Sequence, residues 1–452
     1  MFHPSVMRSV RAACGRVLLS AVVAVGLLVG LPASAPAAGV QTTPADWTPY
    51  LLPSPVDQVV EELRSCKGTM YAVGSVTAVG GGSGSSATYQ RSNAFSFSAT
   101  TGAMTTWAPA VNGPVRSIAL SPDCRTAYLG GSFTRVNTRR ARYLVAVNAV
   151  TGRVRRHFKR TADAPVSTVR YTHGAVIVGG EFTVVNGVRR SHLASLNPRT
   201  GAVTSYLHLR IRGTYPDTET RTHTKVYNSQ LSHDRHRMLI EGVFTSINRN
   251  PRQQAAVLKL GRTSVHLTRW RSKELTRPCS LPFYVKAGAW SPDDKKIYLA
   301  TTGHKPTSGP GSHRHDPRAG LCDAVAAFPA TSSAVHHTWI NYTGCDSLYA
   351  VAADSRSVYI SGHERWADNS DGCDAPGTGA VSRPGIGAIN QRTGLARPWN
   401  PTRSRGYGSH QLLLTSAGLW IASDTWLNGD AQDCGGQPQH GGICFFPFLG
   451  AG

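Results

Sequence analysis

Short apolar runs punctuated by glycine dominate the pattern of hydrophobic and polar positions along the chain. Three of these runs are closely similar: residues 128–137, 176–186 and 239–248 each pass from β-branched or aromatic residues through Gly, Phe and Thr to a closing Asn. Runs of this composition, bounded by turn-forming residues, predict β-strands. Weaker copies lie at 71–74, 297–303, 358–362 and 419–423. Recurrence at a regular period indicates a repeat architecture.

Seven units result when the copies are aligned on one small residue in each. Successive anchors lie 49 to 62 residues apart, at Gly74, Gly131, Gly180, Gly242, Gly303, Gly362 and Ser423. In each unit a first strand ends in an Asp-bearing turn and the glycine run forms a second strand. A third strand ends in a Thr-Gly hairpin turn, and a fourth carries an aromatic residue. Four antiparallel strands repeated radially predict an all-β fold, a seven-bladed β-propeller.

The fourth strand of the last unit is missing at the C-terminal end of the sequence. Its counterpart stands near the start, where the segment around Trp47 copies those around Trp107 and Trp399. We therefore expect the N-terminal segment to complete the last blade and remove an open sheet edge. The alternative is that Trp47 belongs to a disordered tail.

The repeat resembles a known family. The pattern Gly-Gly-x-Phe-Thr-x-Val-Asn at 130–137 and 179–186, followed by Leu-Ala-x-Leu-Asn at 193–197, is similar to the delta-60-type β-propeller repeats of secreted bacterial proteins. The resemblance covers essentially the whole chain after the leader. It implies a propeller fold and an extracellular location. It assigns no catalytic residue, because a fold does not imply a function.

Composition narrows the class of protein further. The 452 residues include 46 Gly, 27 Pro and only 16% charged residues, which excludes a disordered chain and a long-helix protein. Lys and Arg number 48 against 25 Asp and Glu, so the formal net charge is +23. A surface with this excess of positive charge attracts polyanions.

The first residues predict a leader rather than part of the fold. Arg8, Arg11 and Arg16 precede an apolar stretch at 17–31 and a small-residue cleavage site at 35–37. We therefore expect a signal peptide at 1–37 and a single propeller domain at 38–452 in a secreted protein. No other apolar run is long enough to span a bilayer.

Cysteine usage agrees with export. Apart from Cys14 in the leader, the cysteines are even in number and form no Cys-x-x-Cys, which favours disulfides over zinc. Spacing alone leaves 105 pairings open. Placing each cysteine on a face of the propeller predicts the pairs Cys66–Cys124, Cys279–Cys322, Cys345–Cys373 and Cys434–Cys444. A free buried thiol is the alternative for any one of them.

Basic loops gather on one face of the expected propeller. Second-to-third strand loops and blade-to-blade crossovers share this face, here called the top face. The guanidinium fork of arginine suits carboxylate, phosphate or sulfate oxygens. We expect an anion-binding arc of Arg139, Arg140, Arg142, Arg189, Arg190, Arg249 and Arg252. The alternative is that these arginines serve solubility alone.

The partner expected from this arc is an anionic cell-wall or extracellular polymer, bound by a monomer without a cofactor. No recognition helix or single-strand aromatic platform points to nucleic acid. The Ser-His-Arg-His-Asp stretch at 312–316 offers metal ligands, but a loop with an opposing arginine predicts solvation rather than a metal site. His223, His363 and His410 are further candidates for the top face.

Two other function classes remain open. The sequence has no Gly-x-Ser-x-Gly, His-Glu-x-x-His or phosphate loop, yet an acid/base set assembled from several blades would escape such a search. A polysaccharide lyase or hydrolase on a propeller scaffold is the runner-up, and a structural adhesive module is the third. A His or Tyr facing carboxylates at the centre of the top face would favour the enzyme.

Overall fold

The computed structural model describes residues 39–450, apart from positions 83, 215–222, 306–319, 332, 407, 425–432 and 439. By its contacts the chain divides into Met1–Pro36 and Ala37–Gly452, and only the second unit is considered below. The leader expected at 1–37 lies outside the described residues and stays a prediction. Within the described ranges, no helix is long and apolar enough to cross a membrane.

The described chain is all-β, and its helical structure is limited to one 3-10 turn, η1 (Lys273–Thr276). The large antiparallel sheets follow one another along the sequence, and each is entered through its innermost strand. These innermost strands are β2 (Val59–Cys66), β7 (Val115–Leu120), β12 (Val166–Thr172), β18 (Lys225–Leu231), β24 (Val285–Trp290), β28 (Leu348–Ala353) and β33 (Ser409–Leu414).

The second and third strands of each sheet carry the repeat found in the sequence. The second strands are β3 (Thr69–Ser75), β8 (Thr126–Gly131), β13 (Ala175–Gly180), β19 (Arg237–Val243), β25 (Lys296–Thr301), β29 (Ser357–Gly362) and β34 (Gly418–Ser423). The third strands are β6 (Ala94–Ser98), β11 (Leu144–Asn148), β16 (Leu193–Leu196), β22 (Ala255–Leu260), β26 (Ala324–Pro329), β32 (Gly387–Asn390) and β37 (Ile443–Pro447).

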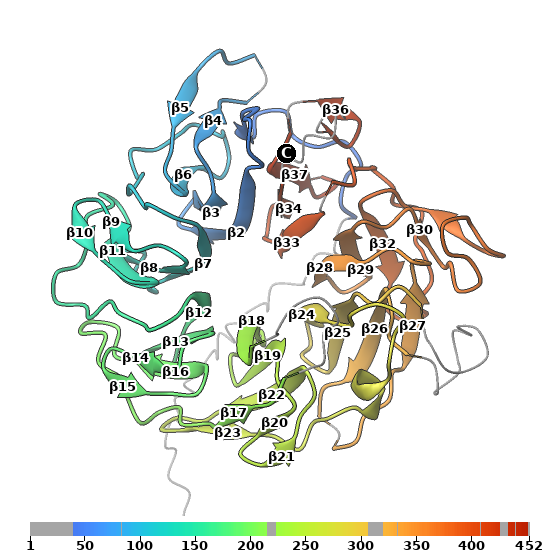
Figure 1. Ribbon diagram of the computed structural model, residues 1–452. Helices are drawn as coiled ribbons and strands as arrows, with labels where there is room; N and C mark the ends of the chain where they lie inside the picture. Colours follow the sequence, from blue (N-terminus) through green and yellow to red (C-terminus); the bar gives the residue numbers. More distant parts are fainter. Residues whose placement is uncertain are drawn as a thin grey trace, which may run out of the picture. The chain divides into compact units, whose positions relative to one another are not determined.

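The innermost strands form a ring around an axis (Figure 1). Each contacts the innermost strand of the following sheet, in the order β2, β7, β12, β18, β24, β28 and β33, and β33 contacts β2. Sheets arranged radially in this way make a β-propeller. An all-β propeller fold, as expected from the repeat, is therefore present.

Fourth strands are fewer than expected among the described residues. Among the described residues only two large sheets have one, β23 (Val265–Leu267) and β27 (Trp339–Tyr342). In others the segment after the Thr-Gly turn contributes a single bridge, such as Val147 to Val154 or Ile389 to Ala396. The aromatic residue of the segment is present even where the segment forms no strand. In the first sheet, the Trp107 indole N–H donates to the carbonyl of Asn148 in the next sheet, at 3.0 Å.

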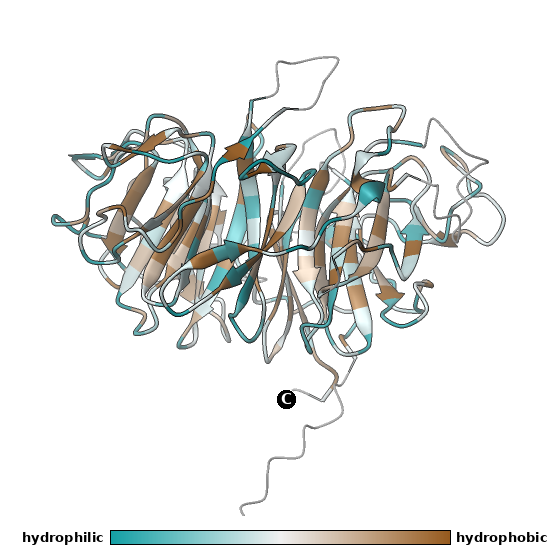
Figure 2. Cartoon of the chain, turned by 90° about the horizontal axis from the view of Figure 1, so that it is seen from below, coloured by the Kyte–Doolittle hydropathy of each residue, from teal (hydrophilic) through white to brown (hydrophobic). Residues whose placement is uncertain are grey.

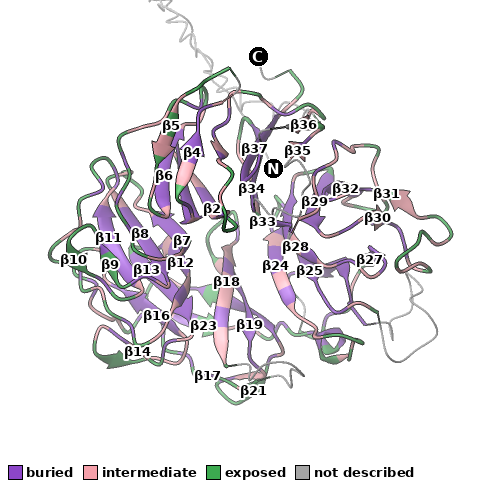
Figure 3. Cartoon of the chain, turned by 45° about the horizontal axis from the view of Figure 1, so that its top comes forward, coloured by how far each residue is buried: buried purple, intermediate pink, exposed green. Residues whose placement is uncertain are grey.

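Small hairpins lie outside the large sheets and form the rim in Figure 1. They interrupt the second-to-third strand connections or flank them, and their tips are among the exposed parts of the chain in Figure 3. Their strands are β1 (Tyr50–Leu51), β4 (Ala78–Gly80), β5 (Thr88–Gln90), β9 (Arg135–Val136), β10 (Arg139–Arg140), β14 (Val184–Val185), β15 (Val188–Arg189), β17 (Ile211–Arg212), β20 (Ser246–Ile247), β21 (Asn250–Pro251), β30 (Trp366–Ala367), β31 (Val381–Ser382), β35 (Asp433–Cys434) and β36 (Gln437–Pro438).

The core lies between neighbouring sheets. Apolar side chains such as Val73 on β3 and Ile118 on β7 pack in one such layer, and Figure 2 shows hydrophobic residues concentrated along the strands. Glycine lets the layers approach: a Cβ on Gly130 would come within 2.6 Å of Val166 Cγ1 on the next sheet. The glycine run is therefore a packing requirement of the repeat.

Four disulfides join the pairs expected from the sequence. Cys66–Cys124 connects the first two sheets with Cα atoms 6.0 Å apart. The other bridges are Cys279–Cys322, Cys345–Cys373 and Cys434–Cys444, with Cα separations of 5.8, 4.7 and 6.5 Å. The face-by-face assignment of the cysteines is confirmed.

Candidate functional site at the propeller axis

Every innermost strand carries a β-bulge near its start. The register with the second strand shifts by one residue at this point, and the skipped residue is the bulged one. A bulge frees one side chain from the alternation of the strand and re-aims it. The bulged residues are Glu61, Arg116, Ser167, Tyr227, Lys286, Tyr349 and His410.

All of these bulged residues line one cavity of about 790 Å³ on the axis, at the end where the innermost strands begin. We call this set the axial ring. Further polar residues near the starts of the strands line the same cavity, among them Asp57, His223, Lys225 and Tyr284. The volume falls within the range of small-molecule binding pockets.

On four innermost strands, β2, β7, β12 and β33, the residue after the bulge hydrogen-bonds to the next sheet. On β2, Glu62 Oε2 accepts hydrogen bonds from Ser117 Oγ and from the Ile118 backbone N–H, both at 2.7 Å. On β33, Gln411 Oε1 accepts from the Leu63 backbone N–H at 2.7 Å. The scaffold contacts and the axial ring thus occupy adjacent positions of one strand. The ring stands on rigid elements, which favours a preorganised site.

Glu61 is the carboxylate of the axial ring, and cations flank it on both sides. His410 Nδ1 lies 2.9 Å and Arg116 Nη1 3.6 Å from its carboxylate oxygens. Burial by itself would raise the pKa of Glu61, but His410, Arg116 and Lys286 together lower it. Burial opposes the charge on His410 as well, yet the Glu61 carboxylate raises the pKa of His410 above its usual value. The pair is an imidazolium–carboxylate couple.

Lys286 faces the cavity between two aromatic rings. Its ammonium nitrogen lies 5.2 Å from the centroid of Tyr284 and 5.4 Å from that of Tyr349. Burial lowers the pKa of Lys286, and the nearby Lys225 lowers it further, while Glu61 acts in the opposite direction. Lys225 is itself paired with Glu181 at 3.5 Å. An ammonium between aromatic faces is a cation–π arrangement, and its N–H groups remain available to an anionic ligand.

Buried charges lie close to the axial ring. The Arg170 guanidinium, 7% exposed, pairs with Glu62 at 2.9 Å and donates to the backbone carbonyl of Ser229. Glu241 is fully buried on the neighbouring sheet, and within the described ranges its carboxyl oxygens have no hydrogen-bond partner. Burial raises the pKa of Glu241 to about 8. This carboxyl is therefore protonated at neutral pH.

The seven arginines of the expected arc lie on or beside separate rim hairpins rather than on the axis. Arg139 and Arg140 form β10, Arg189 ends β15, and Arg249 precedes β21 (Figure 1). These four side chains are exposed, and so is that of Arg142, whose backbone bridges to Thr161.

Arg190 and Arg252 have a structural role instead. The Arg252 guanidinium donates to the carbonyls of Pro251 and Thr268 and is 6% exposed. Arg190 makes the corresponding contacts with Arg189 and Thr204, and burial lowers the pKa of Arg252. Each of these two guanidiniums ties a rim hairpin to the segment after the third strand.

Two of the histidines expected on the top face line the axial cavity, and the third packs beside it. His223 and His410 line the axial cavity, and the His363 ring packs edge-on against Tyr349 with the centroids 5.1 Å apart. The stretch 312–316 lies outside the described residues.

Comparisons with known proteins add a fold likeness and nothing more specific. The sequence matches no protein-family model and no curated protein. Among solved structures, that of U3-55K is similar at 9% identity and a TM-score of 0.49, covering 90% of this chain and all of that one. The WD40 repeats of RRP9 (9% identity, TM-score 0.48) cover 91% of this chain and all of theirs. BamB from Moraxella catarrhalis (12% identity, TM-score 0.41) covers 89% of this chain and 98% of its own.

The axial ring escaped the sequence reasoning, although a signal for it exists. In each repeat the bulged residue follows an apolar or small residue at the start of the first strand, as Glu61 follows Val60 and Lys286 follows Val285. Aligning the units on their first strands rather than on their glycine runs would have placed these chemically diverse residues in one column.

Proposed function

We propose that the protein is an extracellular binding propeller that takes one unit of an anionic polymer into its axial cavity. The observation that carries the proposal is the axial ring, in which Arg116, Lys286 and His410 line one cavity and Glu61 is the acidic member. Of the other carboxylates that line the cavity, Glu62 is paired with Arg170 and Glu181 with Lys225. Cations in a recessed site focus the field on an incoming anion. Tyrosine faces beside Lys286 offer apolar contact for a sugar ring.

The exposed rim arginines fit the same function in a different role. Arg139, Arg140, Arg189 and Arg249 carry charge on surface hairpins, where solvent screens it. Such charges increase the rate of encounter with a polyanion rather than fix one of its units. We propose that the rim collects the polymer and that the axial ring selects the unit.

We further propose that the propeller has seven blades, that residues 40–52 complete the last one, and that the chain belongs with the delta-60-type secreted propellers. Support for the closure comes from Val40, which bridges to Phe448 after β37, and from Ala45, whose N–H donates to the Phe445 carbonyl. Trp47 lies over the turn of the first sheet, where a Cβ on Gly102 would meet its backbone carbonyl. Four disulfides suit an oxidising compartment.

The test compares three double variants that each remove two positive charges. Arg116→Gln with Lys286→Gln alters the axial ring, Arg140→Gln with Arg189→Gln alters the rim, and Lys295→Gln with Lys296→Gln is the control. Lys295 and Lys296 lie at the turn into β25, away from the cavity. Binding is measured by titration with polygalacturonate and dextran sulfate, with neutral dextran as a blank, at several salt concentrations.

We expect the axial variant to lose at least tenfold in affinity at every salt concentration. The rim variant should lose affinity at low salt and have a weaker salt dependence, and the control should resemble the parent protein. Equal losses in all three variants would attribute binding to net charge alone. Failure of the parent protein to bind either polyanion at low salt would refute the proposal.

A second candidate function is a polysaccharide lyase or hydrolase. The observation that favours it is the His410–Glu61 pair, 2.9 Å apart, in one cavity with Tyr349 and Lys286. These groups supply a proton donor and acceptor from different blades, as general acid–base catalysis requires. Incubating the protein with the polymers that it binds and assaying new reducing ends and unsaturated products decides between the functions. Turnover that is lost in Glu61→Gln while binding persists would establish the enzyme.

A further inference from the structure

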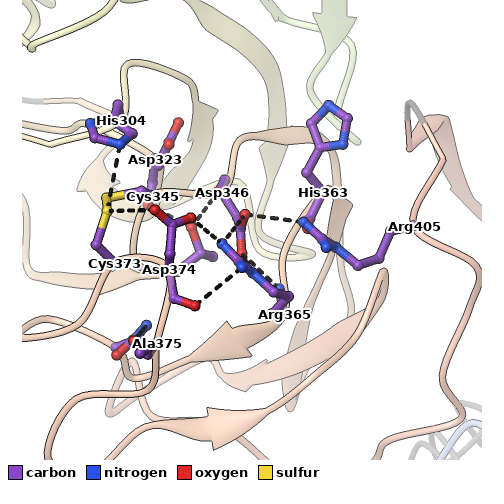
Figure 4. A network of polar contacts seen from close by, with 12 residues as sticks. His304, Asp323, Cys345, Asp346, His363, Arg365, Cys373, Asp374, Ala375 and Arg405 are labelled. Carbon is purple, nitrogen blue, oxygen red and sulfur yellow. Dashed lines mark hydrogen bonds and ion pairs between the residues drawn. A yellow bond between two sulfur atoms is a disulfide. The ribbon is translucent and has the colours of Figure 1, made fainter.

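A second polar cluster lies away from the axis, where three segments meet (Figure 4). His304 follows β25, Cys345 precedes β28, and Cys373 and Asp374 lie between β30 and β31. The His304 Nε2 atom is 3.5 Å from Cys373 Sγ, and Asp374 Oδ2 is 4.0 Å from the same sulfur. The ligand atoms of His304, Cys345 and Cys373 all lie within 4.8 Å of one another.

The 3.5 Å separation of His304 Nε2 and Cys373 Sγ is close to one edge of a tetrahedral zinc site. With Zn–S bonds of about 2.3 Å and Zn–N or Zn–O bonds of about 2.0–2.2 Å, neighbouring ligand atoms are roughly 3.3–3.8 Å apart. Cys345, Cys373 and His304 supply three of the four ligands that such a site needs. The exposed Asp374, next to Cys373 in the sequence, is the candidate for the fourth. In the structure the two sulfurs are joined as the Cys345–Cys373 disulfide.

Contacts outside the cluster hold the other two ligands in place. Ser280 Oγ lies 2.9 Å from His304 Nδ1, so a proton on Nδ1 can be held there while the Nε2 lone pair faces the sulfur. Arg365 Nη2 donates to Asp374 Oδ1 at 2.9 Å, which leaves Oδ2 on the side of Cys373. Asp346 in turn pairs with Arg365 at 2.8 Å. Metal ligands in proteins are oriented by second-shell partners of this kind.

We propose that the Cys345–Cys373 disulfide is the oxidised state of a zinc site, and that its reduction lets His304, Cys345, Cys373 and Asp374 bind Zn²⁺. A dithiol supplies the two electrons: the Sγ–Sγ bond breaks, two protein thiols form, and the dithiol becomes a disulfide. Zn²⁺ then displaces the two thiol protons, because the thiolate is the ligand form of cysteine. The oxidised protein has no thiolate at this place and does not bind the metal there.

The experiment uses the full mature chain, with Co²⁺ as the spectroscopic probe and a phosphine as a reductant that does not compete as a thiol ligand. Alkylation and mass spectrometry identify which cysteines are free. The reduced protein should bind one Co²⁺ with a thiolate-to-metal absorption band, and the oxidised protein should show no band. His304→Ala should weaken binding at least tenfold and Ser280→Ala about tenfold. His336→Ala, which changes an exposed histidine elsewhere, should behave as the parent protein.

A second variant guards against unfolding on reduction. Cys345→Ser leaves Cys373 as a free thiol beside His304 and Asp374 while the other three disulfides stay closed, so it needs no reductant. We expect it to bind Co²⁺ with a single-thiolate band that disappears in Cys345→Ser with His304→Ala. Wild-type affinity in the reduced His304→Ala protein, or no band in Cys345→Ser, would overturn the proposal.

Discussion

Truncating Trp47 tests whether the N-terminal segment stabilises the last sheet. The Trp47 ring is half-buried and packs against Trp420 and Phe445, with centroid distances of 5.8 and 5.6 Å. A fully buried Trp→Ala change costs about 3–5 kcal/mol. Half of that range, with about 0.5–1.5 kcal/mol for the aromatic contacts, gives roughly 2–4 kcal/mol for Trp47→Ala.

Two other variants calibrate this value. Trp107 is 1% exposed and donates its indole N–H to Asn148, so Trp107→Ala should cost more, about 4–5 kcal/mol. Leu395 is 38% exposed, and Leu395→Ala should change stability by less than about 0.5 kcal/mol. The assay is urea unfolding with tryptophan fluorescence and circular dichroism, with the slope of each transition compared between variants.

Deletion of residues 40–52 extends the same test. It removes backbone hydrogen bonds from Gln41 to Pro447, from Ala45 to Phe445 and from Leu51 to Gly441, in addition to the Trp47 contacts. It also exposes the edge of β37, so we expect a larger loss of stability together with self-association. The closure would be refuted if Trp47→Ala had the same unfolding midpoint as Leu395→Ala. It would also be refuted if the protein lacking residues 40–52 had the same melting temperature as the parent and remained monomeric.

Three further outcomes follow from the described contacts. The pKa of Glu241 is about 8 in the folded state, against 4.5 for an ordinary glutamate. Between pH 4.5 and about 8, Glu241 is therefore protonated in the folded state and ionised in the unfolded state. The free energy of unfolding should therefore fall as the pH rises from about 5 to 8, and Glu241→Gln should flatten that part of the profile measured by urea titration. Arg252→Ala should lower stability by about 1–3 kcal/mol, because two backbone carbonyls lose their donor, whereas Arg249→Ala on the surface should lie within about 0.5 kcal/mol of the parent in the same assay. Glu61→Gln should lower the pKa of His410 in an NMR titration, since the carboxylate that stabilises the imidazolium is gone, and an unchanged pKa would contradict the ion pair.

The strands and the disulfides could be predicted because the repeat fixes them locally. Glycine is required where neighbouring sheets meet, as at Gly130, and the hairpin turns need residues that accept left-handed dihedrals, as at Gly152. Dividing each unit into strands assigns every cysteine to one face of the propeller. Only a few other cysteines on the same face are then close enough to form a disulfide with it. The absence of a fourth strand from most of the described sheets was not predicted. An aromatic residue can anchor its segment through packing and one indole hydrogen bond, so the segment needs no backbone pairing with the third strand.

The roles of the arginines could not be read from residue type alone. Arg189 and Arg190 are neighbours in the sequence, yet Arg189 is exposed while the Arg190 guanidinium donates to backbone carbonyls. The guanidinium fork that suits a carboxylate ligand suits two carbonyl groups equally well. Which one it meets depends on the segment after the third strand, and the local sequence does not encode that distance.

The bulge explains why one position in the repeat can change its chemistry while the fold stays constant. Residues on either side of it are held by the ladder and the core. The residue before the bulge is Val or Leu in every innermost strand except β33, and the residue after it hydrogen-bonds to the neighbouring sheet on β2, β7, β12 and β33. Tyr227 and the Glu61–His410 pair do contact an adjacent sheet, but no bulged residue pairs in the ladder, so glutamate, arginine, serine, tyrosine, lysine and histidine are all accommodated there. A propeller of this kind can therefore acquire a new ligand by changing the axial ring, while the ladders and the apolar layers that hold its sheets together stay in place.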